Sequence, residues 1–230
     1  MKPFDQPGHR GPHLGVLATI FALLFIGGLS YVISFSSGAP HFPNPMEPAQ
    51  IIVTYFQNNP HDVLLCAFFQ FASAIPLGLF TVTAYSRMNF LGVRAAGPTI
   101  ALFGGILTSV TVVISSLIIW VMAYPGIAQD ASVIRTLYYI AFAVGGVGFS
   151  VPMGLLIAGL AVPAGFMKLS PKGLVWTGLL FALFGELSTL SLVFPKLVPL
   201  IPLTRFPGFI WLIIAGFKLP ASSAQPAASR

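Results

Sequence analysis

The sequence has 230 residues, of which 56% are hydrophobic and only 7% charged, against about 25% charged in soluble domains. Eleven basic and five acidic side chains cannot give a soluble globule of this length a hydrated surface, which excludes a soluble enzyme and a disordered chain. The single cysteine, Cys66, excludes a disulfide scaffold. Basic residues scattered singly between apolar runs do not indicate a nucleic-acid partner.

Apolar runs of membrane-spanning length follow one another along the chain. A helix needs about 20 apolar residues to cross a bilayer core of about 30 Å. The first run is longer than the ~7–15-residue core of a signal peptide, so we expect it to be retained. We expect an all-α bundle in one domain (14–219), a polar leader (1–13), a disordered tail (220–230) and six spans over residues 14–35, 60–85, 98–123, 136–162, 173–194 and 198–217.

The segment between the first two spans is rich in proline. Prolines at positions 40, 43, 45 and 48 predict a loop. A short helix near residues 49–58 then gathers its apolar residues on one face, which predicts that the face lies among the lipid headgroups. These apolar residues are Ile51, Ile52, Tyr55 and Phe56. Asn59 is expected to cap the next helix, with Pro60 at its first position.

The last apolar segment is irregular. Prolines at positions 195, 199, 202 and 207 interrupt it. The run from Phe206 to Phe217 has 12 residues and would extend only ~18 Å as a helix. We therefore expect a broken or partly re-entrant helix, in which the point where the helix begins decides how deep Arg205 lies.

The distribution of Lys and Arg predicts the orientation. With the N-terminus inside, eight of these residues fall in cytoplasmic segments and three in outer segments. The positive-inside rule therefore predicts that both termini are cytoplasmic. We expect the membrane to be a bacterial-type inner membrane.

Three of the spans carry small or polar residues at every fourth position. Such stripes let helix backbones approach closely, and they predict that spans two, three and four form the centre of the bundle. The stripes are Cys66, Gln70, Ala74 and Gly78; Gly97, Ala101, Gly105 and Ser109; and Ser150, Gly154 and Ala158. The glycines at 104–105 and 145–148 lack the strand and the Gly-Lys-Ser/Thr of a phosphate loop, so we attribute them to helix packing or local flexibility.

Three polar residues inside spans are candidate binding residues. Glu186 lies about eight residues from the outer end of its span, where a carboxylate must be paired, protonated or facing a wet cavity. Arg205 is its expected partner, in a buried pair that is either structural or lines a substrate or proton path. Gln70 is expected to hydrogen-bond across to Ser109, Thr111 or Ser150.

The sequence predicts no metal or cofactor. His41, Glu47, His61 and Asp62 all lie on the outer side, but their spacing matches no metal-ligand motif. No histidine lies deep inside a span, since His61 stands at the very start of the second, which excludes a mid-membrane haem. His9 and His13 belong to a leader that we expect to be mobile. No hydrolase motif occurs, so no catalytic residue is assigned.

Several segments resemble a family of bacterial multi-pass membrane proteins that is classed only as a domain of unknown function. The resemblance extends over residues 50–220 and is carried by Pro202 to Leu212 (PLTRFPGFIWL), Phe68 to Phe71, Gly92 to Pro98 and Gly146 to Phe149. It implies a helical membrane domain and brings no activity, substrate or catalytic residue.

Three functions remain open. The packing stripes and the lack of catalytic motifs favour a non-catalytic accessory or self-associating module, whose partners are lipid, another copy or another membrane protein. Glu186 and the broken last helix favour a small transporter or a binder of an apolar or small molecule. The third reading is a membrane-embedded lipid-modifying enzyme that uses His41, His61 or Glu186 as its acid–base group.

Overall fold

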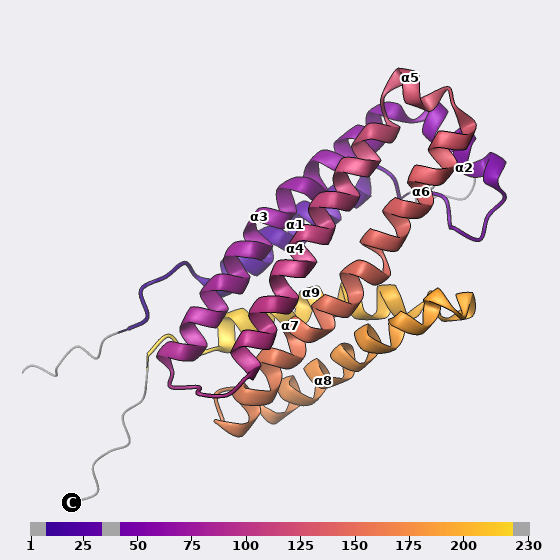
Figure 1. Cartoon of the computed structure of the whole chain (residues 1–230). Coiled ribbons are helices and arrows are strands. Elements are labelled where there is room, and N and C mark those ends of the chain that lie inside the picture. The colour runs from indigo at the N-terminus through magenta and orange to yellow at the C-terminus, as the bar shows by residue number, and fades with distance from the viewer. Residues whose placement is uncertain (1–7, 34–41, 223–230) are drawn as a thin grey trace, which may run out of the picture.

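The computed structural model describes residues 8–33 and 42–222, and all its regular elements are helices (Figure 1). This confirms the predicted all-α bundle. The elements are α1 (Leu14–Ser30), α2 (Ala49–Asn58), α3 (Pro60–Phe90), α4 (Gly97–Met122), α5 (Pro125–Ala128), α6 (Ala131–Gly145), α7 (Val147–Phe166), α8 (Lys172–Leu187), the 3-10 turns η1 (Ser188–Leu192) and η2 (Pro195–Leu197), and α9 (Leu200–Lys218).

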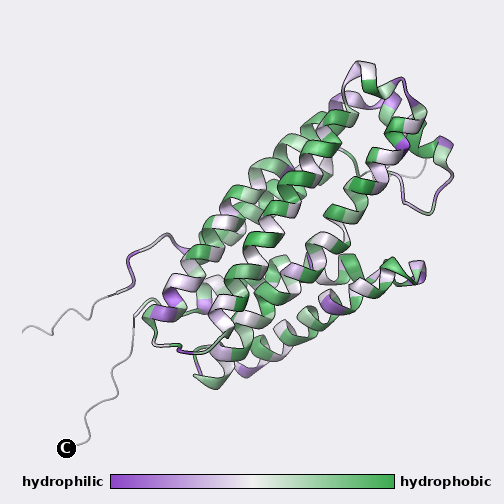
Figure 2. Ribbon diagram, viewed as in Figure 1, coloured by the Kyte–Doolittle hydropathy of each residue, from purple (hydrophilic) through white to green (hydrophobic). Residues whose placement is uncertain are grey.

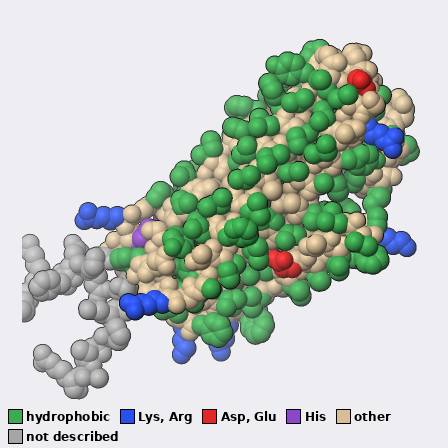
Figure 3. Space-filling model, in the orientation of Figure 1, with side chains coloured by type: hydrophobic (Ala, Val, Ile, Leu, Met, Phe, Trp, Pro, Cys, Tyr) green, Lys and Arg blue, Asp and Glu red, His purple; other side chains and the backbone are tan. Residues whose placement is uncertain are grey.

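Within residues 8–33 and 42–222, five helical segments are long and apolar enough to cross a membrane, so the chain is a polytopic membrane protein. They are α3, α4, α6 with α7, α8 with η1, and η2 with α9. Hydrophobic residues run along these helices (Figure 2) and cover the flank of the molecule between its two ends (Figure 3). The predicted first span is represented by α1, whose 17 residues correspond to about 25 Å; the rest of that span, from residue 34, lies outside the described residues.

The long helices run back and forth between two ends of the bundle. The described chain ends lie together at one end, where His9 and Ala221 are joined by a backbone hydrogen bond, and α2 and α5 lie at the other (Figure 1). Lys and Arg side chains gather at both ends of the face drawn in Figure 3. Which end is cytoplasmic remains a prediction from the Lys and Arg count.

Close packing brings α4 to the centre, between α3 and α7, as the small-residue stripes predict. A Cβ atom on Gly159 of α7 would lie 2.5 Å from the Ala101 nitrogen and 2.6 Å from the Gly97 oxygen. The stripe at Ser150 and Gly154, in contrast, faces α8. These small residues are therefore used to pack helices of the same chain.

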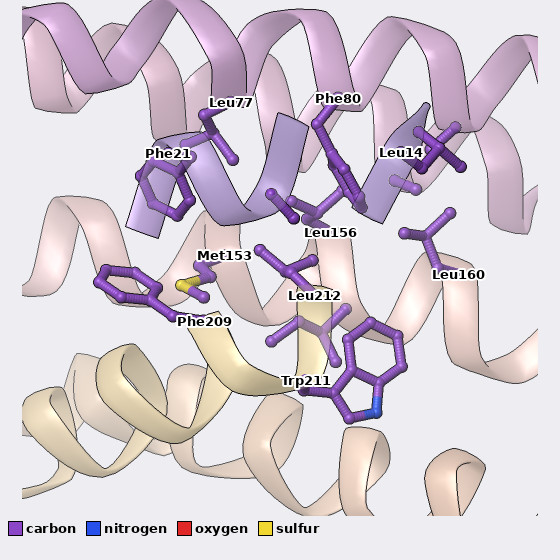
Figure 4. Packing of buried hydrophobic residues seen from close by; sticks show 14 of the residues in the cluster. Leu14, Phe21, Leu77, Phe80, Met153, Leu156, Leu160, Phe209, Trp211 and Leu212 are labelled. Atoms are coloured by element: carbon purple, nitrogen blue, oxygen red, sulfur yellow. The ribbon is translucent and has the colours of Figure 1, made fainter. Parts of the chain in front are cut away.

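The hydrophobic core falls into two clusters. The larger joins α1, α3, α7 and α9, and Figure 4 shows its side chains pointing into one another, among them Phe80 of α3, Leu156 of α7 and Leu212 of α9. The second lies toward α2 and α5 and includes Phe56, Ile134 and Tyr138. The candidate site lies between the two clusters.

Two expectations about the outer segments need correction. The apolar face of α2 does not lie open to the headgroups, because Ile52, Tyr55 and Phe56 are buried against the protein while Ile51 is exposed. Asn59 precedes α3 but gives it no side-chain cap, and its amide donates instead to the Tyr55 carbonyl of α2.

The last segment is more regular than its prolines indicate. After η2, α9 runs from Leu200 to Lys218 with Pro207 inside it. Arg205 therefore lies within a continuous helix, five residues after its start, which is about 8 Å along the helix axis.

Candidate functional site

A partly open cavity of about 200 Å³ lies in the bundle, where α1, α3, α4, α6, α7 and α9 meet. This is larger than the ~150 Å³ of an engineered apolar cavity that binds benzene. Its wall is mostly apolar and holds a few polar groups, as small-molecule sites do. It is lined by Phe25, Leu29, Val32, Phe42, Pro43, Cys66, Gln70, Val112, Ser115, Ile119, Tyr138, Ala141, Phe142, Gly145, Gly146, Phe149, Ile201 and Arg205.

A break between α6 and α7 shapes one wall of the cavity. The apolar stretch from Ala131 to Phe166 is interrupted at Gly146, which ends α6 and begins α7 with φ −89° and ψ −92°. The last carbonyls of a helix have no intrahelical donor, and in an apolar environment each needs another. The carbonyl of Gly145 accepts a hydrogen bond from the guanidinium of Arg205 in α9.

Arg205 is held in place by aromatic rings as well as by this hydrogen bond. Its guanidinium carbon lies 4.7 Å from the centroid of the Phe149 ring and 5.5 Å from that of Phe25, within cation–π range. Its Nε atom is buried and has no hydrogen-bond partner among the described residues. Arg205 also lines the cavity and thus presents a positive charge at its wall.

Glu186 does not pair with Arg205, which corrects the expected buried ion pair. No carboxylate of the described residues lies within ion-pair distance of the guanidinium, and none lines the cavity. Glu186 is exposed. One of its carboxylate oxygens lies beside Gly154 of α7, at 3.3 Å from the position that a Cβ atom on this glycine would take.

Gln70 does line the cavity, but it makes none of the expected bonds across to Ser109, Thr111 or Ser150. Its amide nitrogen donates to the Cys66 sulfur one turn away, at 3.4 Å. Two of the three predicted binding residues, Gln70 and Arg205, therefore line the same cavity, and Glu186 lies outside it.

Two further polar residues of the wall were not identified from the sequence. Tyr138 donates its buried hydroxyl to the Pro43 carbonyl at 2.6 Å, and Ser115 donates to the Ala141 carbonyl at 3.1 Å. Ser115 fits against α6 because Gly145 leaves room for its hydroxyl. The pair of glycines at 145–146 was the available signal, but a glycine pair alone predicts flexibility as readily as a helix break.

None of the described histidines lines the cavity. His61 is exposed and lies 3.6 Å from Asp62, whereas His41 is outside the described residues. Among residues 8–33 and 42–222 no three His, Cys, Asp or Glu side chains come together as metal ligands. His9 and His13 make defined contacts: His9 lies 3.0 Å from the Ser86 hydroxyl, and the His13 ring accepts from the Val16 amide at the start of α1.

No protein-family model, curated protein or solved structure matches the chain. The site is therefore interpreted from its own geometry.

Proposed function

We propose that this membrane protein binds a small amphipathic molecule in the cavity between α1, α3, α4, α6, α7 and α9. The observation that carries the proposal is a space of about 200 Å³ whose wall is mostly apolar yet holds Arg205, Gln70 and Ser115. Arginine inside a membrane protein is costly and marks a functional site by default. A wall of this kind binds an apolar body and orients it through a few polar contacts.

Two observations favour binding over the accessory or self-associating module. The small-residue stripes that motivated a partner are used within the chain, as at Gly97 against Gly159 and at Gly154 against Ala182. The two core clusters also leave between them a space that a purely structural bundle would fill with side chains. A lipid-modifying enzyme is less well supported, because Glu186 and His61 do not line the cavity.

Cys66 offers a direct test because it lines the cavity and is the only cysteine of the chain. The protein in nanodiscs is treated with methyl methanethiosulfonate, a small thiol reagent, at increasing concentrations of octanol. We expect octanol to slow the modification of Cys66 in a saturable way. Protection that rises without saturation, or no protection at all, would contradict a binding cavity.

A pair of variants on α6 provides the control. Ala141 lines the cavity and is buried, whereas Ala143, two residues later, is exposed. Ala141→Phe places a ring in the cavity and is expected to abolish protection by octanol. Ala143→Phe adds the same ring at the exposed position and is expected to leave it unchanged.

A further inference from the structure

The cavity holds a positive charge that the described protein does not neutralise. A buried cation in an apolar setting needs an opposite charge or a full set of hydrogen bonds. Arg205 has five N–H donors, of which Nη2 contacts the Gly145 carbonyl and Nε is buried without an acceptor. The aromatic faces of Phe25 and Phe149 stabilise the charge but accept no conventional hydrogen bond.

The other polar groups of the wall are neutral. Tyr138 and Ser115 already donate to backbone carbonyls, and Gln70 carries no charge. No Asp or Glu of residues 8–33 and 42–222 lines the cavity. The charge of the wall therefore attracts an anion, and no carboxylate of the described lining residues would pair with a cation.

From this we infer that the ligand is an oxyanion with an apolar body, a carboxylate or phosphate that binds the Arg205 guanidinium while its apolar part lies against Phe25, Val112 and Ile119. The inference rests on the proposed function and adds the chemical class of the ligand. Guanidinium groups bind carboxylate and phosphate through two parallel N–H donors. A fatty-acid carboxylate and a phospholipid phosphate share this chemistry.

The test compares three probes with the same tail and different head groups. Carbon-14 octanoate is bound to the full chain in phosphatidylcholine nanodiscs at neutral pH and displaced by octanoate, octanol or octylammonium. We expect octanoate to bind roughly tenfold or more tightly than the other two, because a charge-assisted hydrogen bond is worth about 1.5–3 kcal/mol. Equal displacement by all three would overturn the inference while leaving the cavity as a binding site.

Failure of the proposed function gives a different result. If neither octanoate nor octanol binds, or if Ala141→Phe binds both as the wild type does, the cavity is not the site. The wild-type comparison of head groups needs no variant, so the inference stays testable even if Arg205 variants fold poorly.

Variants of Arg205 then assign the preference to this side chain. Arg205→Gln is expected to lose the preference for octanoate and keep octanol binding, and Arg205→Lys, which retains the charge, to keep part of the preference. If Arg205→Gln keeps the full preference for octanoate, the inference is overturned.

Native mass spectrometry of protein from phosphatidylglycerol nanodiscs distinguishes the two sources of the oxyanion, a fatty acid and a phospholipid. An adduct absent from Arg205→Gln identifies a phospholipid or a fatty acid by its mass, and adducts equal in both proteins would count against Arg205.

Discussion

Arg205 of α9 donates to the carbonyl of Gly145, the last residue of α6. This bond joins two segments that are 60 residues apart in the sequence and supplies a donor at the point where the α6–α7 stretch is broken. The same guanidinium lies over the ring of Phe149 in the first turn of α7. One side chain thus fixes the break and places a charge at the cavity wall.

A double-mutant cycle distinguishes this arrangement from the expected ion pair with Glu186. Because the two groups do not meet, Glu186→Gln and Arg205→Gln should have additive effects on the free energy of unfolding, within about 0.5 kcal/mol. The measurement is unfolding of the purified protein in mixed detergent micelles. Arg205→Gln with Phe149→Leu is the matched cycle, and we expect a coupling of about 0.5–1 kcal/mol there. If the coupling energy between Arg205 and Glu186 exceeds that between Arg205 and Phe149, the two charged groups form an ion pair after all.

Close packing at Gly159 is a second testable feature. In Gly159→Ala the new methyl group would stand 2.5 Å from the Ala101 nitrogen, a backbone atom that cannot move away cheaply. We expect a loss of about 1–3 kcal/mol in the free energy of unfolding. Gly27→Ala in α1 is the control, since nothing lies within 4 Å of its Cβ, and it should be neutral or slightly stabilising. Equal effects of the two substitutions would contradict the packing of α4 on α7.

The helical segments were predictable because long apolar runs have few alternatives in a membrane. The prolines of the last segment predicted an irregular entry, which the structure has in η1 and η2, but they do not interrupt α9, for a physical reason. Pro199 stands at the N-cap of α9 and Pro202 in its first turn, where the backbone N–H groups need no helical acceptor. Only Pro207 lies farther inside the helix, so Pro199 and Pro202 are compatible with a helix that begins at Leu200.

The candidate site was only partly predictable. Depth along the helix placed Glu186 and Arg205 at a similar level, but depth does not say which way a side chain points. Glu186 passes over Gly154 on the α7–α8 side, whereas Arg205 reaches the end of α6. Gln70 was found because a polar side chain inside a span is rare. The break at Gly146 depends on tertiary packing, and no local pattern specifies it.

The hydroxyl of Tyr138 ties α6 to the loop before α2. Tyr138→Phe removes its 2.6 Å bond to the Pro43 carbonyl and leaves that buried acceptor without this donor. We expect a loss of about 1–2 kcal/mol in the free energy of unfolding, together with faster hydrogen exchange in residues 42–48. The neighbouring Tyr139 is 38% exposed, and Tyr139→Phe should change neither quantity measurably. If Tyr139→Phe has the larger effect, the hydroxyl of Tyr138 is not the tie between α6 and the loop.

The contact of His9 with α3 is expected to depend on pH. Its ring lies beside the Ser86 hydroxyl, and partial burial, followed by the positive charge of Arg87, lowers the pKa of His9 below its ordinary value of 6.5. The Nδ1 atom is also buried without a hydrogen-bond partner in the described chain, so a proton there would have no acceptor. When the segment detaches, His9 regains its ordinary pKa and binds more protons, so the attached state is favoured at neutral pH and weakened as the pH falls below 6.5.

Cleavage by trypsin after Arg10 measures this attachment, since the bond is protected while the segment lies against α3 and against Ala221. We expect the fraction cleaved in a fixed time, corrected for the pH dependence of trypsin on a peptide of residues 6–14, to rise between pH 7 and pH 5. His9→Asn removes the titrating ring and should flatten the pH dependence, while His13→Asn, which alters the contacts with Val16 at the start of α1 and with the Phe217 ring, should retain it. A corrected cleavage rate that falls on acidification, or one that keeps its pH dependence in His9→Asn, would show that His9 does not control the attachment.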